Sequence, residues 1–592
     1  MPAGYPGYVL HALTTGDAVE RRSDPPGARL LPAPWAAVLA VCSGAILVPA
    51  FPPAGWWPLA CLGVAGLTVA TRGRTARFGA LLGTLTGLTF FLAHLHWSGV
   101  YVGALPWVAL AVLQTVFVTA LGALLPGVWL AHDALLAHGP PPHGERDGAP
   151  LPTPARAVLA ALAVVAGTAG LWVAQEALRT RVPFGGFPWG RLAFSQSDGP
   201  LARWAWLGGA PLTSAAVAVA GGAVAVLVIA SAHALRGRRP PVERPDDRRS
   251  TRARRLAEPL AALACLTVVP LAYAVPVASA HAASDDTVRV AAIQGDVPEA
   301  GLEFNAERRA VLDNHVRGTE ELAAQVADGR AEQPDLVFWP ENASDIDPLR
   351  NPDAAAVISR AADAIGAPIL VGAVLREPVG YLSNAGIVWN PGTSDHPGPG
   401  VRYVKKHPAP FAEYIPARSF FRLFSKKVDL VRTDFAPGHL NGALPMGGTT
   451  VGDVICFEVA YDGIVQQSVR DGAALLAVQT NNATFGYTDE SVQQLAMSRL
   501  RAIETGRAVV HISTVGVSAI YGPDGAQLAR SGHFTPEVLQ ATVPLRTGLT
   551  PAVRLGVVPE AMIALLGLAI AIGGVLVTRR SRQRSDRASM QT

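Results

Sequence analysis

Charged side chains are scarce in this sequence. Asp, Glu, Lys and Arg together make up 16% of the 592 residues, whereas hydrophobic residues make up 50%. A soluble globular chain usually carries about 25% charged residues. The shortage of charge excludes an ordinary soluble composition and favours a protein with a large membrane-embedded part.

Cysteine is also rare, with four residues in the chain. Cys42, Cys61 and Cys265 lie within apolar runs, where a cysteine usually behaves as a small hydrophobic residue. Only Cys456 has neighbours of mixed chemistry. Because no spacing matches a zinc site or a disulfide framework, we expect no metal site, no disulfide and no cofactor.

Long apolar runs are abundant, and a membrane-spanning helix needs about 20 largely apolar residues. Candidate spans lie at residues 35–51, 56–70, 78–95, 105–131, 157–177, 211–235 and 260–280, and an eighth lies at 557–577. The first two are short and are separated by Pro52 and Pro53, so a single broken hairpin is the alternative there. The runs predict a polytopic α-helical domain with about eight transmembrane helices.

Arginine is concentrated in three segments, at residues 72–77, 236–255 and 579–587. With eight spans, all three lie on the same side of the membrane as the N-terminus, and the positive-inside rule makes that side cytoplasmic. Both termini are therefore expected in the cytoplasm, and the polar region after residue 286 on the outer face. The run at 236–255 contains no aromatic residue, so we interpret it as a solvated loop and expect no nucleic-acid partner.

One outer loop breaks this charge pattern. It carries Arg179, Arg181, Arg191 and Arg203 around an aromatic segment at 184–189. Aromatic residues at this depth are ordinary membrane anchors. The alternative is a platform for a lipid headgroup or a substrate.

The sequence pattern changes after residue 286, where short runs typical of β-strands alternate with stretches typical of helices. We expect strands at 288–293, 336–339, 368–372, 385–389, 450–456, 474–480, 508–513 and 517–521, and helices at 304–328, 352–365, 461–471 and 490–505. This alternation predicts an α/β domain. The predicted division of the chain is a disordered cytoplasmic tail at 1–33, a membrane domain at 34–281, an α/β domain at 286–545, a last transmembrane helix at 556–578 and a basic cytoplasmic tail at 579–592.

Three polar residues stand near the ends of apolar strands, where α/β domains place their sites: Glu341, Lys405 and Cys456. Each has an ordinary structural interpretation by itself, as a helix cap, a solvated lysine or a core cysteine. Together they form a sensible acyl-transfer set, in which Glu341 removes the thiol proton and Cys456 attacks a carbonyl. Lys405 and a backbone N–H then hold the oxyanion. His407 is either a base or a packing residue.

These segments carry a resemblance. Trp-Pro-Glu at 339–341, Lys405 and Ile-Cys-Phe-Glu at 455–458 resemble the nitrilase (carbon–nitrogen hydrolase) superfamily. With membrane helices on both sides, and further matches at 185–189, 410–416 and 480–486, the chain is similar to the apolipoprotein N-acyltransferase family. The resemblance implies an extracytoplasmic nitrilase-like αββα sandwich in a bacterial plasma membrane.

The resemblance also implies a reaction and its residues. A cysteine takes an acyl chain from a phospholipid and passes it to the N-terminal amine of a diacylated lipoprotein, in the last step of lipoprotein maturation. The implied catalytic residues are Glu341, Lys405 and Cys456. The supporting and substrate-binding residues are Glu413, Glu458, Phe457, Asn481, Tyr414 and Trp189. The implied partners are the phospholipid donor, the lipoprotein acceptor and membrane lipids, and the chain is expected to be a monomer.

Four positions depart from the family pattern. Phe457 stands where tyrosine is frequent, Ala412 where glycine is usual, and Thr484 where tryptophan is common. The family's Asn-Asp pair is Asn481-Asn482 here. These changes concern the shape of the acyl pocket and the substrate preference.

Three other functions compete with this one. The first of them, a degenerate interaction protein, does not fit an intact Glu/Lys/Cys/Glu set. A membrane-tethered amidase would use the same three residues with water as the acceptor. A transporter would need ionisable groups within its spans, and Glu176 and His94 are among the few candidates.

The segment at 410–427 mixes aromatic residues with Arg and Lys. It predicts a lid over a lipid substrate, and the alternative is a satellite hydrophobic cluster under a long loop.

Overall fold

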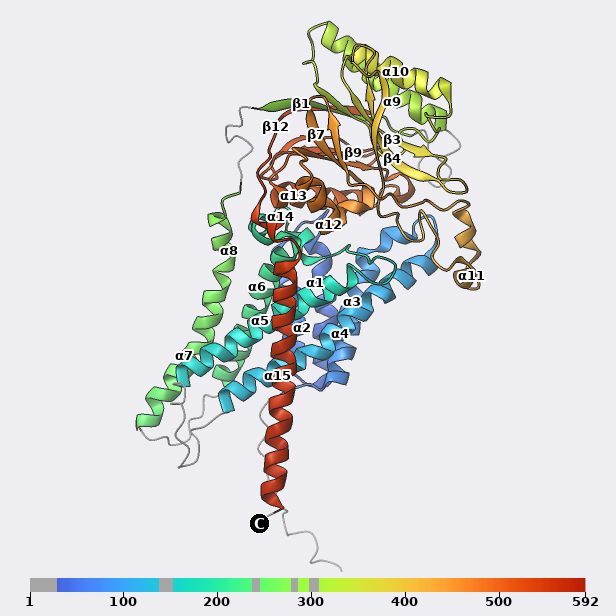
Figure 1. Ribbon diagram of the computed structural model, residues 1–592. Coiled ribbons are helices and arrows are strands. Elements are labelled where there is room, and N and C mark those ends of the chain that lie inside the picture. The colour runs from blue at the N-terminus through green and yellow to red at the C-terminus, as the bar shows by residue number, and fades with distance from the viewer. Residues whose placement is uncertain (1–28, 138–152, 237–244, 278–285, 298–307, 591–592) are drawn as a thin grey trace, which may run out of the picture.

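The computed structural model describes residues 29–137, 153–236, 245–277, 286–297 and 308–590. A bundle of long helices stands below an α/β domain, and the helix that ends the chain runs down along the bundle (Figure 1). The expected two-part architecture is confirmed.

The bundle consists of α1 (Ala33–Leu47), α2 (Pro58–Ala70), α3 (Ala76–His94), α4 (Ala104–Ala137), α5 (Thr153–Arg179), α6 (Ala205–Arg236), α7 (Pro245–Leu266) and α15 (Val558–Ser589). Seven of the described helices are long and apolar enough to cross a membrane, whereas α2 has 13 residues. At 1.5 Å per residue, α2 spans about 20 Å, less than the roughly 30 Å hydrocarbon core. The second expected span is therefore short.

Two basic segments differ from the expected loops and tails. Residues 245–255 begin α7, so this part of the expected solvated loop is helical. The last basic segment continues α15 as far as Ser589. Residues 1–28 of the expected N-terminal tail, residues 237–244 of the loop and residues 304–307 of the first expected helix of the α/β domain lie outside the described residues.

The α/β domain contains two six-stranded sheets. One has the order β12-β1-β2-β3-β4-β5 and the other β11-β10-β9-β8-β7-β6. The strands are β1 (Thr287–Gln294), β2 (Leu336–Phe338), β3 (Ile369–Leu375), β4 (Ser383–Asn390), β5 (Gly398–Val404), β6 (Ala443–Met446), β7 (Thr449–Ile455), β8 (Leu475–Thr480), β9 (Val509–Ser513), β10 (Ala519–Tyr521), β11 (Gln527–Arg530) and β12 (Glu537–Pro544).

Helices cover both outer faces of the paired sheets (Figure 1). The first sheet carries α9 (Arg308–Ala327) and α10 (Pro352–Ile365). The second carries α12 (Asp462–Arg470) and α13 (Glu490–Thr505), which face the membrane helices. The expected αββα sandwich is confirmed.

The four strands that the sequence pattern missed are β5, β6, β11 and β12. All four lie at the edges of their sheets. An edge strand pairs on one side only and tolerates exposed, polar and proline residues. These strands therefore lack the continuous apolar run that marks the central ones.

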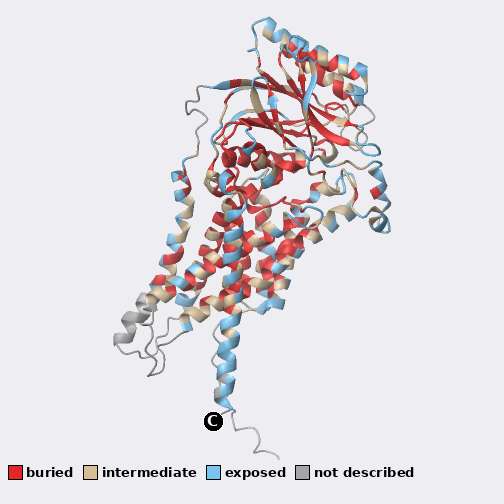
Figure 2. Cartoon of the chain, viewed as in Figure 1, coloured by how far each residue is buried: buried red, intermediate tan, exposed pale blue. Residues whose placement is uncertain are grey.

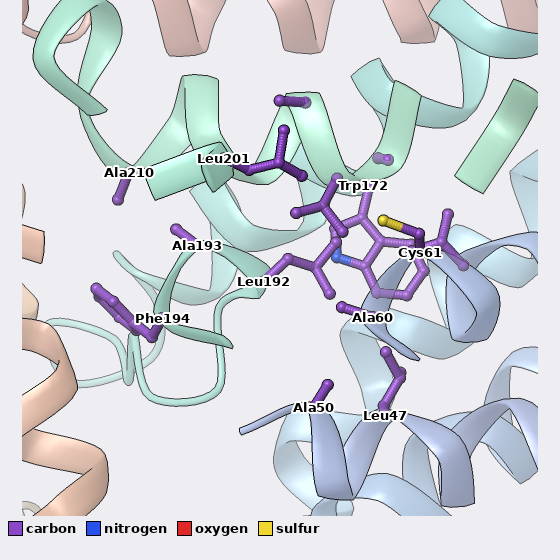
Figure 3. Close-up of a cluster of buried hydrophobic side chains, with 14 of the residues drawn as sticks. Leu47, Ala50, Ala60, Cys61, Trp172, Leu192, Ala193, Phe194, Leu201 and Ala210 are labelled. Carbon is purple, nitrogen blue, oxygen red and sulfur yellow. The ribbon is translucent and has the colours of Figure 1, made fainter. Parts of the chain in front are cut away.

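A continuous hydrophobic core joins the two parts. One cluster of buried side chains extends from the membrane helices to Phe457, Val459 and Leu500 in the α/β domain, and Figure 2 shows buried residues throughout the contact. Within the bundle, Leu192 lies among Leu47, Cys61 and Trp172 (Figure 3). The α/β domain is thus packed on the bundle as well as being linked to it by the chain.

Glycines allow α15 to approach α5 closely. A Cβ at Gly567 would lie 2.5 Å from the backbone of Gly170 and Leu171, whereas nothing lies within 4 Å of a Cβ at Gly573 one and a half turns later. Small residues permit such crossings of membrane helices.

We predict that Gly567→Ala lowers the free energy of unfolding by about 1–3 kcal/mol, because the added methyl group must push two backbones apart. Gly573→Ala is the matched control, and it should be neutral or stabilise α15 by up to about 1 kcal/mol through helix propensity. Thermal unfolding of both variants in one detergent measures the difference. Equal stability of the two proteins would contradict the close packing.

Candidate active site

The expected nucleophile begins a tight turn after a buried strand. β7 ends at Ile455, and the 3-10 turn η8 (Cys456–Ala460) follows. Cys456 has a φ of 54°, a left-handed conformation that is uncommon for a residue with a Cβ. Strained backbone of this kind often occurs at functional sites.

Two polar side chains contact the sulfur. The Thr480 hydroxyl lies 3.3 Å from Cys456 Sγ, and Gln494 Nε2 lies 3.6 Å from it. Burial raises the pKa of the Cys456 thiol, and the negative charge of Glu341 raises it further, while the Lys405 ammonium opposes the shift. The resting group is therefore a thiol, and Cys456 would need a base to act as a nucleophile.

Lys405 lies directly after β5 and is buried between two carboxylates. Its Nζ donates to Glu341 Oε1 at 3.0 Å and to Glu413 Oε1 at 3.0 Å. Asn384 Nδ2 donates to the same two oxygens, at 2.6 and 2.9 Å. Burial opposes the positive charge, but Glu341 and Glu413 outweigh it and hold the pKa of Lys405 well above its usual value. Lys405 is therefore a fixed cation beside the thiol.

Glu341 is positioned from both sheets. Asn481 N donates to Glu341 Oε2 at 2.9 Å, and the Thr514 hydroxyl donates to the Glu341 carbonyl at 3.2 Å. The carboxylate therefore lies between the end of β2 and the end of β8, and its charge acts directly on Cys456. A carboxylate, an ammonium and a thiol in this arrangement can perform acyl transfer.

Glu458 connects the nucleophile turn to the segment that carries Lys405. Its Oε1 accepts bonds from Lys406 N at 2.7 Å, His407 N at 2.9 Å and the Tyr403 hydroxyl at 2.9 Å. Its Oε2 accepts from Ile455 N at 2.9 Å. Burial raises the pKa of Glu458. With four donors in these positions, Glu458 fixes the turn relative to Lys405.

The side of the turn that faces the membrane domain is aromatic. Phe457 stacks on Phe187 and on Trp189, with ring centroids 5.5 and 6.1 Å apart. Trp189 Nε1 donates to Gln493 Oε1 at 2.7 Å, and Trp97 Nε1 donates to the same oxygen at 3.2 Å. The membrane domain thus supplies part of the wall next to the thiol.

Three further predicted residues lie around this centre. Asn481 contacts Glu341 through its backbone, while its side chain accepts a bond from Ala483 N at 3.1 Å. Tyr414 is half-buried, and its carbonyl accepts from Phe411 N. His407 Nε2 lies 2.8 Å from the Tyr461 hydroxyl, which in turn donates to the Gly186 carbonyl at 2.8 Å. His407 is therefore a packing residue at the contact between the two domains.

The interpretation of the outer-loop arginines as a lipid or substrate platform is wrong for Arg179, Arg191 and Arg203. Arg179 and Arg191 are buried. Arg179 donates to the Phe187 carbonyl at 3.0 Å, and Arg203 to the Ala272 carbonyl at 3.1 Å. The guanidinium groups of these arginines bind to other parts of the protein. The position of an arginine in the sequence does not show which partners its side chain has.

Sequence reasoning missed the polar residues that complete the site: Asn384, Thr480 and Gln494. Each is a buried polar residue: Asn384 and Thr480 lie in strands that are otherwise largely apolar, and Gln494 lies on the buried face of α13. A buried polar residue needs a hydrogen-bond partner. A polar residue within a segment predicted to be buried was therefore the signal that could have pointed to these positions.

Comparison with known proteins identifies the family of the chain. Residues 43–223 match the apolipoprotein N-acyltransferase N-terminal domain, and residues 289–549 match the carbon-nitrogen hydrolase family. The chain is 40% identical over 573 residues to an apolipoprotein N-acyltransferase of Mycolicibacterium smegmatis, covering 93% of this chain and 87% of that protein. It is 30% identical to that of Ralstonia nicotianae, covering 93% and 94%.

Among solved structures, an amidase of the nitrilase superfamily from Nesterenkonia AN1 aligns with a TM-score of 0.33 and 16% identity, covering 45% of this chain and 93% of the amidase. The two family matches occur in the order of the two structural domains, and the similarity to the curated relatives extends over nearly the whole chain. The chain belongs to the apolipoprotein N-acyltransferase family, and it is a membrane acyltransferase.

Proposed function

We propose that this enzyme transfers an acyl chain from a phospholipid to the α-amine of an N-terminal S-diacylglyceryl-cysteine, through a thioester on Cys456. The observation that carries the proposal is the Lys405 ammonium, shared by Glu341 and Glu413 beside a thiol that lies next to the membrane domain. The curated relatives bear the name of this activity. One chain supplies every group, which supports a monomer.

In the first step, Glu341 takes the proton of Cys456, and the sulfur attacks the ester carbonyl of the phospholipid. Negative charge develops on the carbonyl oxygen, where the Lys405 ammonium and a backbone N–H stabilise it. The carbon–oxygen bond then breaks. The leaving alkoxide takes the proton from Glu341 and departs as a lysophospholipid, which leaves a thioester on Cys456.

In the second step, the amine of the diacylated lipoprotein attacks the thioester carbonyl. Glu341 accepts a proton from the amine, the carbon–sulfur bond breaks, and Glu341 gives that proton to the leaving thiolate of Cys456. Because both steps develop an oxyanion at one place, the single cation at Lys405 serves both. The two substrates react in turn at one cysteine, which gives a ping-pong reaction.

The distribution of arginine supports an outer location of the catalytic domain. The basic end of α15 lies at the end of the bundle away from the α/β domain (Figure 1). Arg72 pairs with Asp133 near the end of α4, at 2.6 Å. The positive-inside rule then makes this end of the bundle cytoplasmic. We therefore place both termini in the cytoplasm and Cys456 outside, where lipoproteins are matured.

The segment around α11 (Arg418–Phe421) supports the proposed lid. Phe420 and Phe424 are 54% and 66% exposed, whereas Phe421 packs edge-on against Phe184 of the membrane domain at 6.2 Å. Lys427 donates to the Val102 carbonyl in the loop before α4. Exposed rings at the level of the membrane-domain loops can contact lipid.

We predict that Cys456→Ala abolishes N-acylation and forms no adduct, because no other group can carry the acyl chain. Cys456→Ser should fold normally and lose on the order of 10³-fold or more in turnover, since a hydroxyl is a poorer nucleophile than a thiol. Intact mass spectrometry after incubation with phosphatidylethanolamine vesicles measures the adduct. Addition of a diacylated lipopeptide to the acylated wild type should yield the N-acylated peptide; release of free fatty acid instead would indicate the amidase-type alternative.

The raised pKa of Cys456 gives a pH prediction. Alkylation of Cys456 by iodoacetamide should keep accelerating above about pH 8.5, where an ordinary free thiol is half ionised, because its thiolate fraction still increases there. A short unstructured peptide with one internal cysteine and blocked ends is the reference in the same solution, and mass spectrometry measures both adducts. A rate that levels off at or below pH 8.5 would contradict the raised pKa.

The lid gives a third prediction. Replacing Phe420 and Phe424 with serine should slow acylation of Cys456 by phospholipid by about tenfold while leaving acylation by a soluble short-chain p-nitrophenyl ester unchanged, because only the lipid must pass the membrane-facing rings. Leu528→Ser, which changes an exposed residue on β11, is the control. Equal slowing with both donors would count against a lid.

A further inference from the structure

A line of alternating charges connects a membrane helix to the nucleophile turn. Glu176 on α5 lies 3.7 Å from Arg191 Nε, and Arg191 Nη1 lies 2.9 Å from both carboxylate oxygens of Asp462. Asp462, the first residue of α12, also pairs with Arg501 of α13 at 2.7 Å. The line therefore crosses from the bundle into the catalytic domain within four side chains.

Arg501 ends this line on the turn itself. Its Nε donates to the Val459 carbonyl at 2.8 Å, and its Nη2 donates to the Ala460 carbonyl at 2.9 Å. These residues end the five-residue turn that begins at Cys456. Carbonyls at the end of a helical turn lack partners within it, so Arg501 holds the end of the turn opposite to the one held by Glu458.

The line is buried along most of its length. Glu176, Arg191 and Arg501 are 2%, 1% and 0% exposed. Both guanidinium groups lie 5.8 Å from the centroid of the Phe194 ring, which covers them from the membrane domain. Buried ion pairs are held in one geometry, and removal of one partner leaves an unpaired buried charge. Asp462 lies between the Arg191 and Arg501 guanidinium groups, and Arg501 Nη1 also pairs with Glu504. Loss of Arg191 would leave Asp462 with Arg501 as its remaining cation and shift the contacts that Arg501 shares between Asp462 and Glu504.

A second ion pair between the domains has no contact with the turn that begins at Cys456. Arg499, also on α13, pairs with Asp198 of the membrane domain and donates through Nε to the Gly525 carbonyl at 2.8 Å. Its contacts lead away from Cys456. The Arg499 and Asp198 side chains are 29% and 58% exposed, so this pair is more exposed than the first. It serves as a comparison for an interdomain ion pair whose contacts do not reach the turn.

We propose that Arg191, Asp462 and Arg501 are positioning residues for Cys456, through which the docking of the catalytic domain on the membrane domain sets the geometry of the nucleophile turn. The inference rests on the proposed function only in taking Cys456 as the nucleophile. The membrane domain then acts on the chemistry of the thiol as well as on lipid binding.

The test uses the full-length protein in detergent and a soluble short-chain p-nitrophenyl ester, whose burst of p-nitrophenol reports acylation of Cys456 without lipid. Arg191→Gln and Asp462→Asn should each slow the burst by about 10- to 100-fold, the size of effect expected when a reacting group moves by about 1 Å. In the lipid assay, kcat should fall while KM for the phospholipid stays within about twofold, because a misplaced nucleophile affects the transition state more than binding.

Two controls separate positioning from general loss of structure. Arg191→Lys should recover most of the rate, because one nitrogen of Arg191 contacts both oxygens of Asp462 and an ammonium can do the same. Asp198→Asn should leave the burst within about twofold of the wild type. Thermal unfolding confirms that the variants compared are folded.

The proposal is overturned if folded Arg191→Gln and Asp462→Asn proteins show a normal burst, or if Asp198→Asn slows the burst as much as they do. The ester burst needs no lipid and no lipoprotein. Failure of the wild type to acylate a lipopeptide would therefore refute the proposed function without altering this comparison.

Discussion

The buried ammonium of Lys405 is the interaction on which the catalytic centre depends. A buried charge costs several kcal/mol unless partners compensate it, and here Glu341 after β2 and Glu413 after β5 must both approach the same nitrogen. Asn384 from β4 donates to both carboxylates. Three separate stretches of chain are therefore fixed around one nitrogen, and the same contacts that compensate the charge orient Glu341, the proposed base, and Lys405, the proposed oxyanion-binding group.

The nucleophile turn lies between two supports of different origin. Glu458 attaches its first half to the strand and loop that carry Lys405, and Arg501 holds its last two carbonyls from the side of the membrane helices. This bracing accounts for a stable left-handed Cys456. The continuous hydrophobic core across the contact excludes water from the same region, which strengthens the electrostatic interactions there.

Two of the four departures from the family pattern have local explanations. Phe457 uses its ring faces against Phe187 and Trp189, while the hydroxyl of Tyr461 supplies the polar contact to Gly186. Asn482 replaces a carboxylate, but its amide donates to Glu490 Oε2 at 2.7 Å, so a buried carboxyl group from α13 stands beside it. Burial raises the pKa of Glu490 to about 8. The structure gives no explanation for Ala412 or Thr484.

The sequence by itself determined the helical bundle, the central strands, and Glu341 and Cys456 at the ends of two of them, because an apolar run or a polar residue that ends a strand is a local signal. It also singled out Lys405, but not the edge strand β5 that ends before it. The sequence pattern did not predict the edge strands, because an edge strand needs no continuous apolar run. Only the tertiary structure assigned Asn384, Gln494 and Thr480 to the site and turned Arg191 from a candidate lipid contact into part of a buried ion network. The physical reason is that the partner of a buried polar group is chosen by packing between segments far apart in the chain, which no local pattern encodes.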